Sequence, residues 1–126
     1  MAFLLDTTAL LRAVVDDPRL GPTARAAMLD GADSVVSVVS SWEVVIKTTV
    51  GKLRPMPWLR EVLEERRTRR LAMSDEHLVA LADLPLVHRD PFDRLLIAQA
   101  QVETLTVITS DAVFRRYDVP VLDARS

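Results

Sequence analysis

Four acidic residues occupy positions from which they could act together on one ion or one substrate. Asp6 directly follows the apolar run "AFLL", and Asp111 follows the run "TVI" after two intervening residues. Glu43 lies in "SSWEVVIKTTVGKL", and Asp93 lies three residues after Asp90 in "HRDPFDRLLIAQA". Carboxylate oxygens are preferred ligands of hard divalent cations. The four acids therefore predict a site for Mg²⁺ or Mn²⁺, provided that the fold brings them together.

Each of these acids, taken alone, also has a structural explanation. In "DPFD", Asp90 suits the N-cap of a helix, Pro91 its first position and Asp93 its third position. In "SSWE", Ser40 and Glu43 have the spacing of a capping box. The other two acids could cap the helices that follow them. We expect Asp90 to act mainly as a cap, and we assign the chemistry in this stretch to Asp93.

Capping explains the joint placement of all four carboxylates less well. Two carboxylates about 4 Å apart repel each other by about 4 kcal/mol when the effective dielectric constant is about 20. Helix N-termini offset part of this repulsion, and a divalent cation offsets far more of it. The chain has no cysteine and two histidines, His77 and His88, so we expect the ion to be held by oxygen ligands. His88 precedes the helix cap at Asp90 and could act as a general base, but metal-bound water needs no such base. We therefore expect His88 to be a hydrogen-bonded or exposed loop residue.

The pattern of apolar residues predicts the elements that must position these acids. Short apolar or β-branched runs predict strands at residues 2–5, 33–41, 71–73, 105–111 and 119–124. Apolar positions at helical spacing predict helices at residues 9–15, 23–31, 41–53, 57–70, 74–84 and 91–100. Strands that alternate with helices are typical of a parallel sheet covered on both faces. Ligands gather at the carboxyl ends of such strands, where we expect all four acids to arrive.

Length and composition predict one globular domain over residues 1–126. Apolar residues make up 49% and charged residues 27% of the chain, which are ordinary proportions. The apolar runs are far shorter than the roughly 18 residues of a membrane span, and "MAFLLDTT" lacks the basic region of a signal peptide. We therefore expect a cytoplasmic protein that is not inserted in a membrane. The net charge of −2 means that any contact with nucleic acid must be local.

The acids and their flanking sequences resemble those of the PIN domain. The resemblance lies in "LLDTT", "SSWEVVIKTTVGKL", "HRDPFDRLLIAQA" and "VITSD", which carry Asp6, Glu43, Asp93 and Asp111. More narrowly, their order and spacing resemble those of the VapC ribonuclease toxins of bacterial type II toxin–antitoxin systems. The resemblance covers nearly the whole chain, from Asp6 to the run "VPVL" at residues 119–122.

This resemblance implies both a fold and an activity. The fold would be a PIN-like α/β fold, with a five-stranded, mostly parallel sheet flanked by helices on both faces. The activity would be that of a Mg²⁺- or Mn²⁺-dependent endoribonuclease that cleaves RNA and inhibits translation and growth. The catalytic and metal-binding residues would be Asp6, Glu43, Asp93 and Asp111. Thr7 and Thr109 would carry the hydroxyls that hold these carboxylates in orientation.

The resemblance also implies partners besides the RNA substrate. The protein would form a homodimer, and a cognate VapB-type antitoxin would block the acidic pocket, with larger toxin–antitoxin assemblies as a further form. Candidate contacts for RNA or for the antitoxin are Lys47, Arg94, Arg115, Arg116 and Trp58. Lys47 lies four residues after Glu43, so it can either pair with Glu43 or reach a substrate phosphate.

Two further features have more than one interpretation. The basic segment at residues 66–70 could follow an RNA backbone, or it could be the solvated end of a helix. Trp42 could stack on a base, but we expect it to pack in the core.

Two other functions compete with the ribonuclease hypothesis. A phosphoaccepting receiver domain needs an acidic pair after its first strand and a lysine after its last. This chain has Asp6 alone at the first place and no lysine after Lys52. A catalytically inactive PIN scaffold that binds RNA or protein is the second alternative, and the intact set of four acids argues against it.

Overall fold

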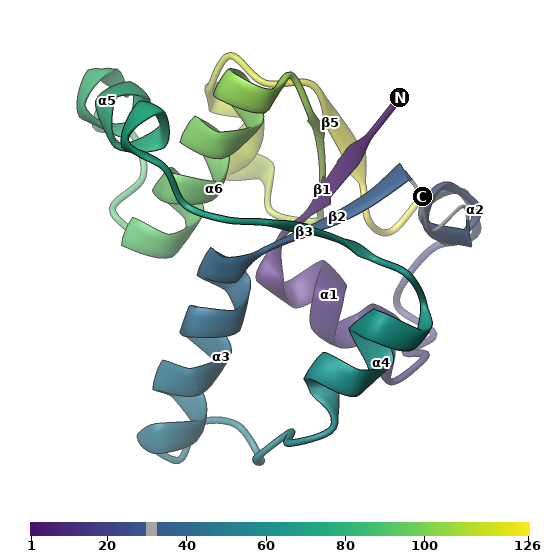
Figure 1. The fold of residues 1–126 in the computed structure, drawn as a ribbon. Helices are drawn as coiled ribbons and strands as arrows, with labels where there is room; N and C mark the ends of the chain where they lie inside the picture. Colours follow the sequence, from purple (N-terminus) through teal and green to yellow (C-terminus); the bar gives the residue numbers. More distant parts are fainter. Residues whose placement is uncertain (30–32) are drawn as a thin grey trace.

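Five parallel strands form the centre of the molecule in the computed structural model, which describes residues 1–29 and 33–126 (Figure 1). The strands run in the order β3-β2-β1-β4-β5 across the sheet, and every neighbouring pair is parallel. Their bounds are β1 Phe3–Leu5, β2 Ser34–Ser37, β3 Arg69–Leu71, β4 Thr106–Thr109 and β5 Val121–Asp123. The helices are α1 Thr7–Val14, α2 Pro22–Leu29, α3 Val38–Thr49, α4 Leu59–Glu65, α5 Asp75–Asp83, α6 Pro91–Glu103 and the short 3-10 helix η2 Ala112–Arg116.

Side chains that alternate along the strands build one core on each face of the sheet. Leu4 and Val107 pack with buried residues of α6, whereas the next residues along, Leu5 and Ile108, pack with buried residues of α1, α2 and α4. Strands buried on both faces read as continuous apolar runs, because neither set of alternating side chains meets water. The predicted α/β fold, with a parallel sheet covered on both faces, is confirmed.

Most of the predicted caps are confirmed. Asp90 is the N-cap of α6, where its Oδ1 accepts a hydrogen bond from the backbone nitrogen of Asp93 at 2.9 Å, and Pro91 opens the helix. Ser74 caps α5, as its predicted position at the start of that helix requires. The helix predicted at residues 23–31 is present as α2, and the final two residues of that prediction lie outside the described residues.

The predicted boundary between β2 and α3 is wrong. The capping box expected in "SSWE" does not form, because α3 begins at Val38 and Ser37 is its N-cap, accepting from the backbone nitrogen of Val39 at 3.0 Å. The strand ends at Ser37 although β-branched residues continue beyond it. Glu43 therefore lies in the second turn of α3 and is not a capping residue.

The helix predicted at residues 57–70 is also too long. Helix α4 ends at Glu65, and Arg67 adopts a left-handed backbone with φ of 54°. The chain then enters β3, where Arg69 pairs with Val35 of β2. Strand pairing decides the structure of this basic segment, so the predicted strand at residues 71–73 starts two residues earlier than expected.

Each helix of the described part of the chain is short. The longest, α6, has 13 residues, and a helix needs roughly 20 apolar residues to cross a bilayer. Within residues 1–29 and 33–126, no helix is long and apolar enough to span a membrane.

Candidate metal centre

The structure brings the four acids to the carboxyl edge of the sheet. Asp6 follows β1, Asp111 follows β4, Glu43 projects from α3 after β2, and Asp93 lies in the first turn of α6. Asp6 and Glu43 are each 5% exposed, whereas Asp111 is exposed. The edge is formed by parallel strands that end side by side, which is where ligands of such sheets bind.

Thr109 connects two of the acids. Its hydroxyl donates to Asp6 Oδ2 at 2.5 Å and accepts from the backbone nitrogen of Asp111 at 3.0 Å. The other oxygen of Asp6 accepts from the backbone nitrogen of Ala9 and caps α1. Asp111 in turn caps η2 through the backbone nitrogen of Val113. Because both acids are held at helix N-termini, their orientations are set before any ligand binds.

Thr7 and Lys47 both contact Glu43. The Thr7 hydroxyl donates to Glu43 Oε1 at 2.7 Å, and the Lys47 ammonium lies 2.7 Å from Glu43 Oε2. The Ser40 hydroxyl, which is fully buried, lies 3.1 Å from that of Thr7. Of the two interpretations of Lys47, the structure therefore shows the ion pair with Glu43. The raised pKa of Lys47 is due first to this hydrogen bond, with smaller contributions from the charges of Asp90 and Asp93.

His88 completes the surroundings of Asp93. Its Nε2 lies 2.8 Å from Asp93 Oδ2, and the two side chains are 23% and 20% exposed. A ring nitrogen of His88 and carboxylate oxygens of Asp93 and Asp111 lie within 4.8 Å of one another. The prediction of a hydrogen-bonded loop histidine is confirmed, but the sequence reasoning missed its place among the acids. Its spacing of five residues before Asp93, across the N-cap of α6, was the available signal.

Burial makes negative charge unfavourable at two of the acids. Burial is the main cause that raises the pKa of Asp6 above its usual value, against the hydrogen bond from Thr109. Burial also raises the pKa of Asp93 to about 6, opposed by the hydrogen bond from His88 and assisted by the charges of Asp90, Asp6 and Glu43. Carboxylates that raise one another's pKa are suited to a cation placed between them. The chemistry of these donors therefore fits a hard divalent ion.

The arginines predicted near the site lie in different surroundings. Arg94 faces the loop before α6, where its Nη1 donates to Pro85 O at 3.0 Å and lies 3.3 Å from the Tyr117 hydroxyl. This guanidinium holds the loop that carries His88. Arg115 and Arg116 lie on η2, directly after Asp111, and both are exposed.

The basic segment between α4 and β3 is held by backbone and side-chain oxygens. Arg66 is the C-cap residue of α4 and donates to Ala13 O at 3.3 Å. Arg70 lies in β3 and donates to Ser41 Oγ at 2.7 Å. The solvated helix end expected for this segment is present at Arg66 and Arg67, which are exposed, whereas Arg69 and Arg70 belong to the strand.

The two tryptophans differ in their relation to the site. The expectation that Trp42 packs in the core is wrong, since it is 48% exposed and contacts Phe92 of α6 edge to face, with ring centroids 4.8 Å apart. The early start of α3 at Val38 turns this residue to the outer face of the helix. Trp58 precedes α4 and is 38% exposed.

Comparison with known proteins places this site in a known fold. Residues 3–120 match the family model of the PIN domain. No curated protein matches the chain. Among solved structures, FitAcB from Neisseria gonorrhoeae is 22% identical, with a TM-score of 0.69 and 97% of each chain covered. VapBC2 from Rickettsia felis, bound to a promoter DNA fragment, is 16% identical, with a TM-score of 0.69 over 97% of this chain and 98% of that chain.

A third structure is a toxin–antitoxin complex from Klebsiella pneumoniae. It is 20% identical, with a TM-score of 0.69 and 98% of each chain covered. At these identities the three structures show the likeness of the fold. The family match extends from β1 to the residue before β5 and includes all four acids of the carboxyl edge. The chain belongs to the PIN domain family.

Proposed function

We propose that this protein is a metal-dependent endoribonuclease and the toxin of a VapBC-type toxin–antitoxin pair. The observation that carries the proposal is the group of four acids at the carboxyl edge of a PIN domain. Two of them are buried, and each contacts a hydroxyl, a backbone amide, the Lys47 ammonium or the His88 ring. PIN domains are generally nucleases. Beyond nuclease activity, we propose that the substrate is RNA and that the bound ion is Mg²⁺ or Mn²⁺.

The chain's own residues would bind and orient the components of the reaction. Asp6, Glu43, Asp93 and Asp111 would hold the ion, while the hydroxyls of Thr7 and Thr109 keep Glu43 and Asp6 in fixed orientations. The bound ion would supply Lewis-acid stabilisation of negative charge on phosphodiester oxygens. Lys47 adds a partly exposed positive charge next to Glu43, which a substrate phosphate could contact. Arg115 and Arg116 are exposed beside Asp111 and would contact the RNA backbone or the antitoxin.

The biological part of the proposal rests on the similar structures. Two of them are named as toxin–antitoxin or VapBC complexes, and the Rickettsia complex is bound to DNA from its own promoter. By analogy, the partner of this chain would be a VapB-type antitoxin that covers the acidic edge in the cytoplasm. Trp58, partly exposed before α4, remains a candidate contact for that partner.

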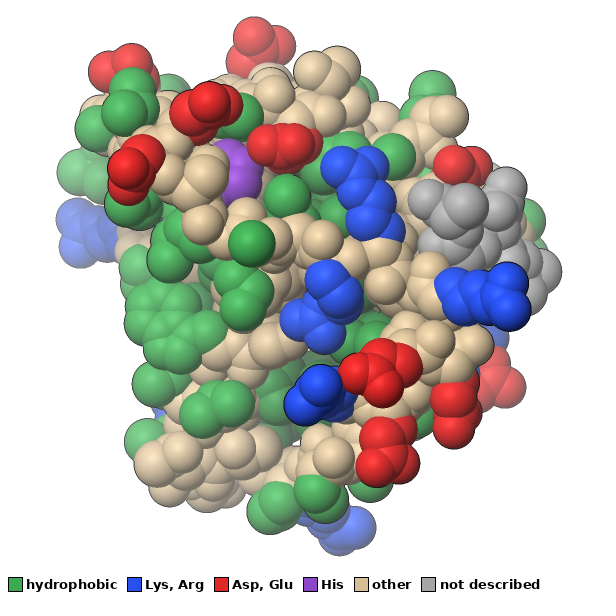
Figure 2. All heavy atoms as spheres, in the orientation of Figure 1, with side chains coloured by type: hydrophobic (Ala, Val, Ile, Leu, Met, Phe, Trp, Pro, Cys, Tyr) green, Lys and Arg blue, Asp and Glu red, His purple; other side chains and the backbone are tan. Residues whose placement is uncertain are grey.

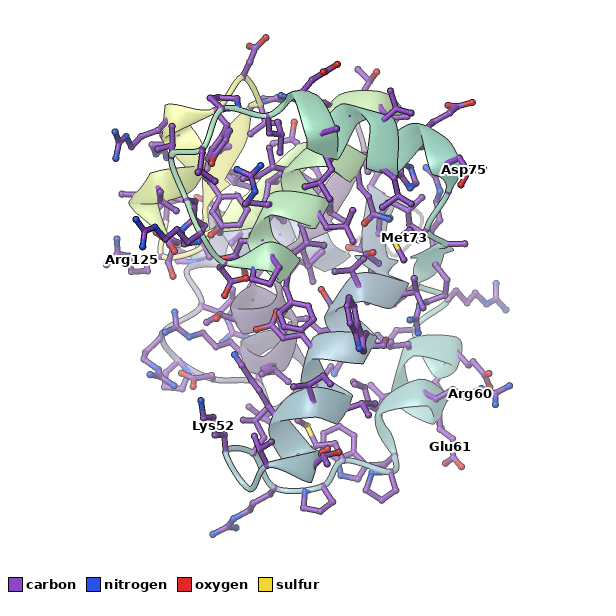
Figure 3. The ribbon with its side chains drawn as sticks, turned by 90° about the vertical axis from the view of Figure 1, so that its left-hand side faces the viewer. Lys52, Arg60, Glu61, Met73, Asp75 and Arg125 are labelled. Atoms are coloured by element: carbon purple, nitrogen blue, oxygen red, sulfur yellow. The ribbon has the colours of Figure 1, made fainter. Side chains whose placement is uncertain are left out.

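We also propose a homodimer, with the outer face of α3 as the contact. Val38, Trp42, Val45 and Ile46 lie at helical spacing on α3 and are between 42% and 58% exposed. Hydrophobic side chains gather on the side of the molecule where α3 lies (Figure 2). Met73, 44% exposed, lies on the same face next to the start of α3 (Figure 3). An apolar stripe of this kind can pack against its own copy across a two-fold axis.

Cleavage assays with purified protein test the enzymatic proposal. We expect the protein to cut single-stranded RNA when Mg²⁺ or Mn²⁺ is present and to stop when EDTA is added. Asp6→Asn should lower the rate at least about 100-fold, because it removes a charged ligand of the ion. Arg60→Gln, a change at an exposed position on α4 that lies outside the site, is the matched control.

The outcome separates this proposal from the inactive scaffold. Tight RNA binding without cleavage, at any divalent ion tested, would favour the scaffold. Cleavage that persists in EDTA would rule out the metal-dependent mechanism. Growth arrest on induced expression, relieved by Asp6→Asn and by co-expression of a cognate antitoxin, would support the toxin assignment.

A further inference from the structure

The loop before α6 holds His88 in a fixed position at the acidic edge. The backbone nitrogen of His88 donates to the Tyr117 hydroxyl at 2.8 Å, and that of Val87 donates to the same oxygen at 3.2 Å. Arg94 Nη1 reaches both this hydroxyl and the carbonyl of His88, at 3.3 and 3.4 Å. Tyr117 is 6% exposed, so these hydrogen bonds anchor the loop to the core. The hydrogen-bonded loop therefore holds the imidazole next to the acids before any ion binds.

The spacing of the donor atoms is close to that of the ligands of one ion. Mg²⁺ and similar ions have octahedral ligands at about 2.1 Å, so neighbouring ligand atoms lie about 3 Å apart and opposite ones about 4.2 Å apart. His88 Nε2 and Asp93 Oδ2 are 2.8 Å apart. A carboxylate oxygen of Asp111 lies within 4.8 Å of both residues' donor atoms. An ion can thus contact all three after small side-chain movements.

We propose that the imidazole of His88 is itself a ligand of the divalent ion, so that the site combines nitrogen and oxygen donors and binds Mn²⁺ in preference to Mg²⁺. This inference rests on the proposed metal-dependent function. Mg²⁺ strongly favours oxygen, whereas later first-row ions accept imidazole well. A nitrogen ligand from "HRDPFD" is thereby added to the oxygen ligands that the sequence leads us to expect.

Coordination changes the hydrogen bonding of the ring. His88 Nε2 lies 2.8 Å from Asp93 Oδ2, and because an ionised carboxylate can only accept a hydrogen bond, a ring that contacts it in this way donates the hydrogen from Nε2. To bind an ion, Nε2 must offer its lone pair, so the single ring hydrogen moves to Nδ1. The Asp93 carboxylate, released from this hydrogen bond, would be available to bind the ion.

Electron spin-echo envelope modulation of the Mn²⁺-loaded protein tests the proposal directly. Mn²⁺ is the probe, and its stoichiometric binding is first checked by EPR titration. We expect modulation from a directly bound ¹⁴N that changes to the ¹⁵N pattern when the histidines are ¹⁵N-labelled. His88→Gln should abolish the modulation and weaken Mn²⁺ binding by about tenfold, with a smaller loss for Mg²⁺. Arg89→Gln, an exposed neighbour in the same loop, should change neither measurement.

The possible results separate this inference from the proposed function. Stoichiometric Mn²⁺ binding without histidine nitrogen coupling overturns the ligand role of His88 and leaves the carboxylate site intact. No Mn²⁺ binding to the parent protein at all overturns both. The labelled parent protein gives the decisive spectrum by itself, so the test does not depend on the stability of the His88→Gln variant.

Discussion

At the scale of single residues, the two aspartates of "HRDPFD" have different tasks. Asp90 uses Oδ1 to cap α6. Asp93, three residues later, is partly buried beside His88, and its pKa is raised to about 6, mainly by burial. Burial makes the Asp93 carboxylate costly to ionise, and this side chain does not cap the helix. Binding of a cation therefore explains the residue better than a contribution to folding stability does.

The raised pKa of Asp93 predicts how stability depends on pH without metal. In the unfolded chain this group has a pKa near 3.8, so between about pH 4 and pH 6 the folded state binds the extra proton. The free energy of unfolding should therefore rise as the pH falls from 7.5 to 5. Asp93→Asn should remove this part of the pH dependence and, at pH 7.5, stabilise the protein by about 2 kcal/mol. Urea titrations in EDTA measure both effects.

A matched change at the neighbouring acid gives the control. Asp90→Ala should lower the free energy of unfolding by about 1 kcal/mol, because it removes a helix cap. If Asp93→Asn were instead as destabilising as Asp90→Ala, Asp93 would be a structural residue and its assignment to the metal site would be wrong.

At the scale of elements, helix α3 has two functional faces. Its inner face carries Glu43 to the acidic edge, where Thr7 of α1 contacts it. Its outer face carries the exposed apolar residues proposed for the dimer contact. The helix can serve both because it begins at Val38, directly after a short strand, so Glu43 lies in its second turn.

The outer face of α3 predicts the effect of a single charge on self-association. Val45 is 58% exposed on this face, so Val45→Lys should leave the fold intact and weaken the dimer at least tenfold. Val15→Lys, which changes a residue that is 59% exposed after α1, should leave association unchanged. Sedimentation velocity over a range of concentrations distinguishes one chain from two. A parent protein that stays monomeric at high concentration would contradict the proposed dimer.

At the scale of the whole molecule, the proposed metal site joins segments that are far apart in the sequence. Asp6 and Thr109, separated by 103 residues, share a hydrogen bond, and Glu43 and Asp93 come from helices that follow different strands. An ion bound here would therefore stabilise the packing of the entire fold, because the unfolded chain cannot offer the same ligands together.

This linkage predicts that divalent ions raise the melting temperature. At a Mn²⁺ concentration about 100 times its dissociation constant, the stabilisation should be about 2.7 kcal/mol, or a shift of roughly 8–12 °C for a domain of this size. Asp6→Asn should reduce the shift strongly, and Arg60→Gln should not. Thermal unfolding followed by circular dichroism checks this. Equal shifts in the parent and in Asp6→Asn would mean that the ion binds elsewhere.

Much of this architecture follows from local patterns in the sequence. Apolar runs of strand length, Asp90-Pro91 at the start of α6 and Ser74 at the start of α5 predict the elements and most of their starts. The wrong boundaries lie at Ser37 and Glu65. At both places the residue pattern typical of the element continues past the residue where the element ends. The end is set instead by pairing with another strand or by packing of a helix.

The sequence by itself determined which residue types could hold an ion and that parallel strands would carry them to one edge. Only the tertiary structure decided their partners. It joined Thr109 to Asp6, Thr7 to Glu43, and His88 to Asp93. It also turned Arg94 toward the loop of His88 and Trp42 out of the core. The physical reason is that contact depends on where separate strands and helices end in space, and sequence periodicity places a side chain only relative to its own element.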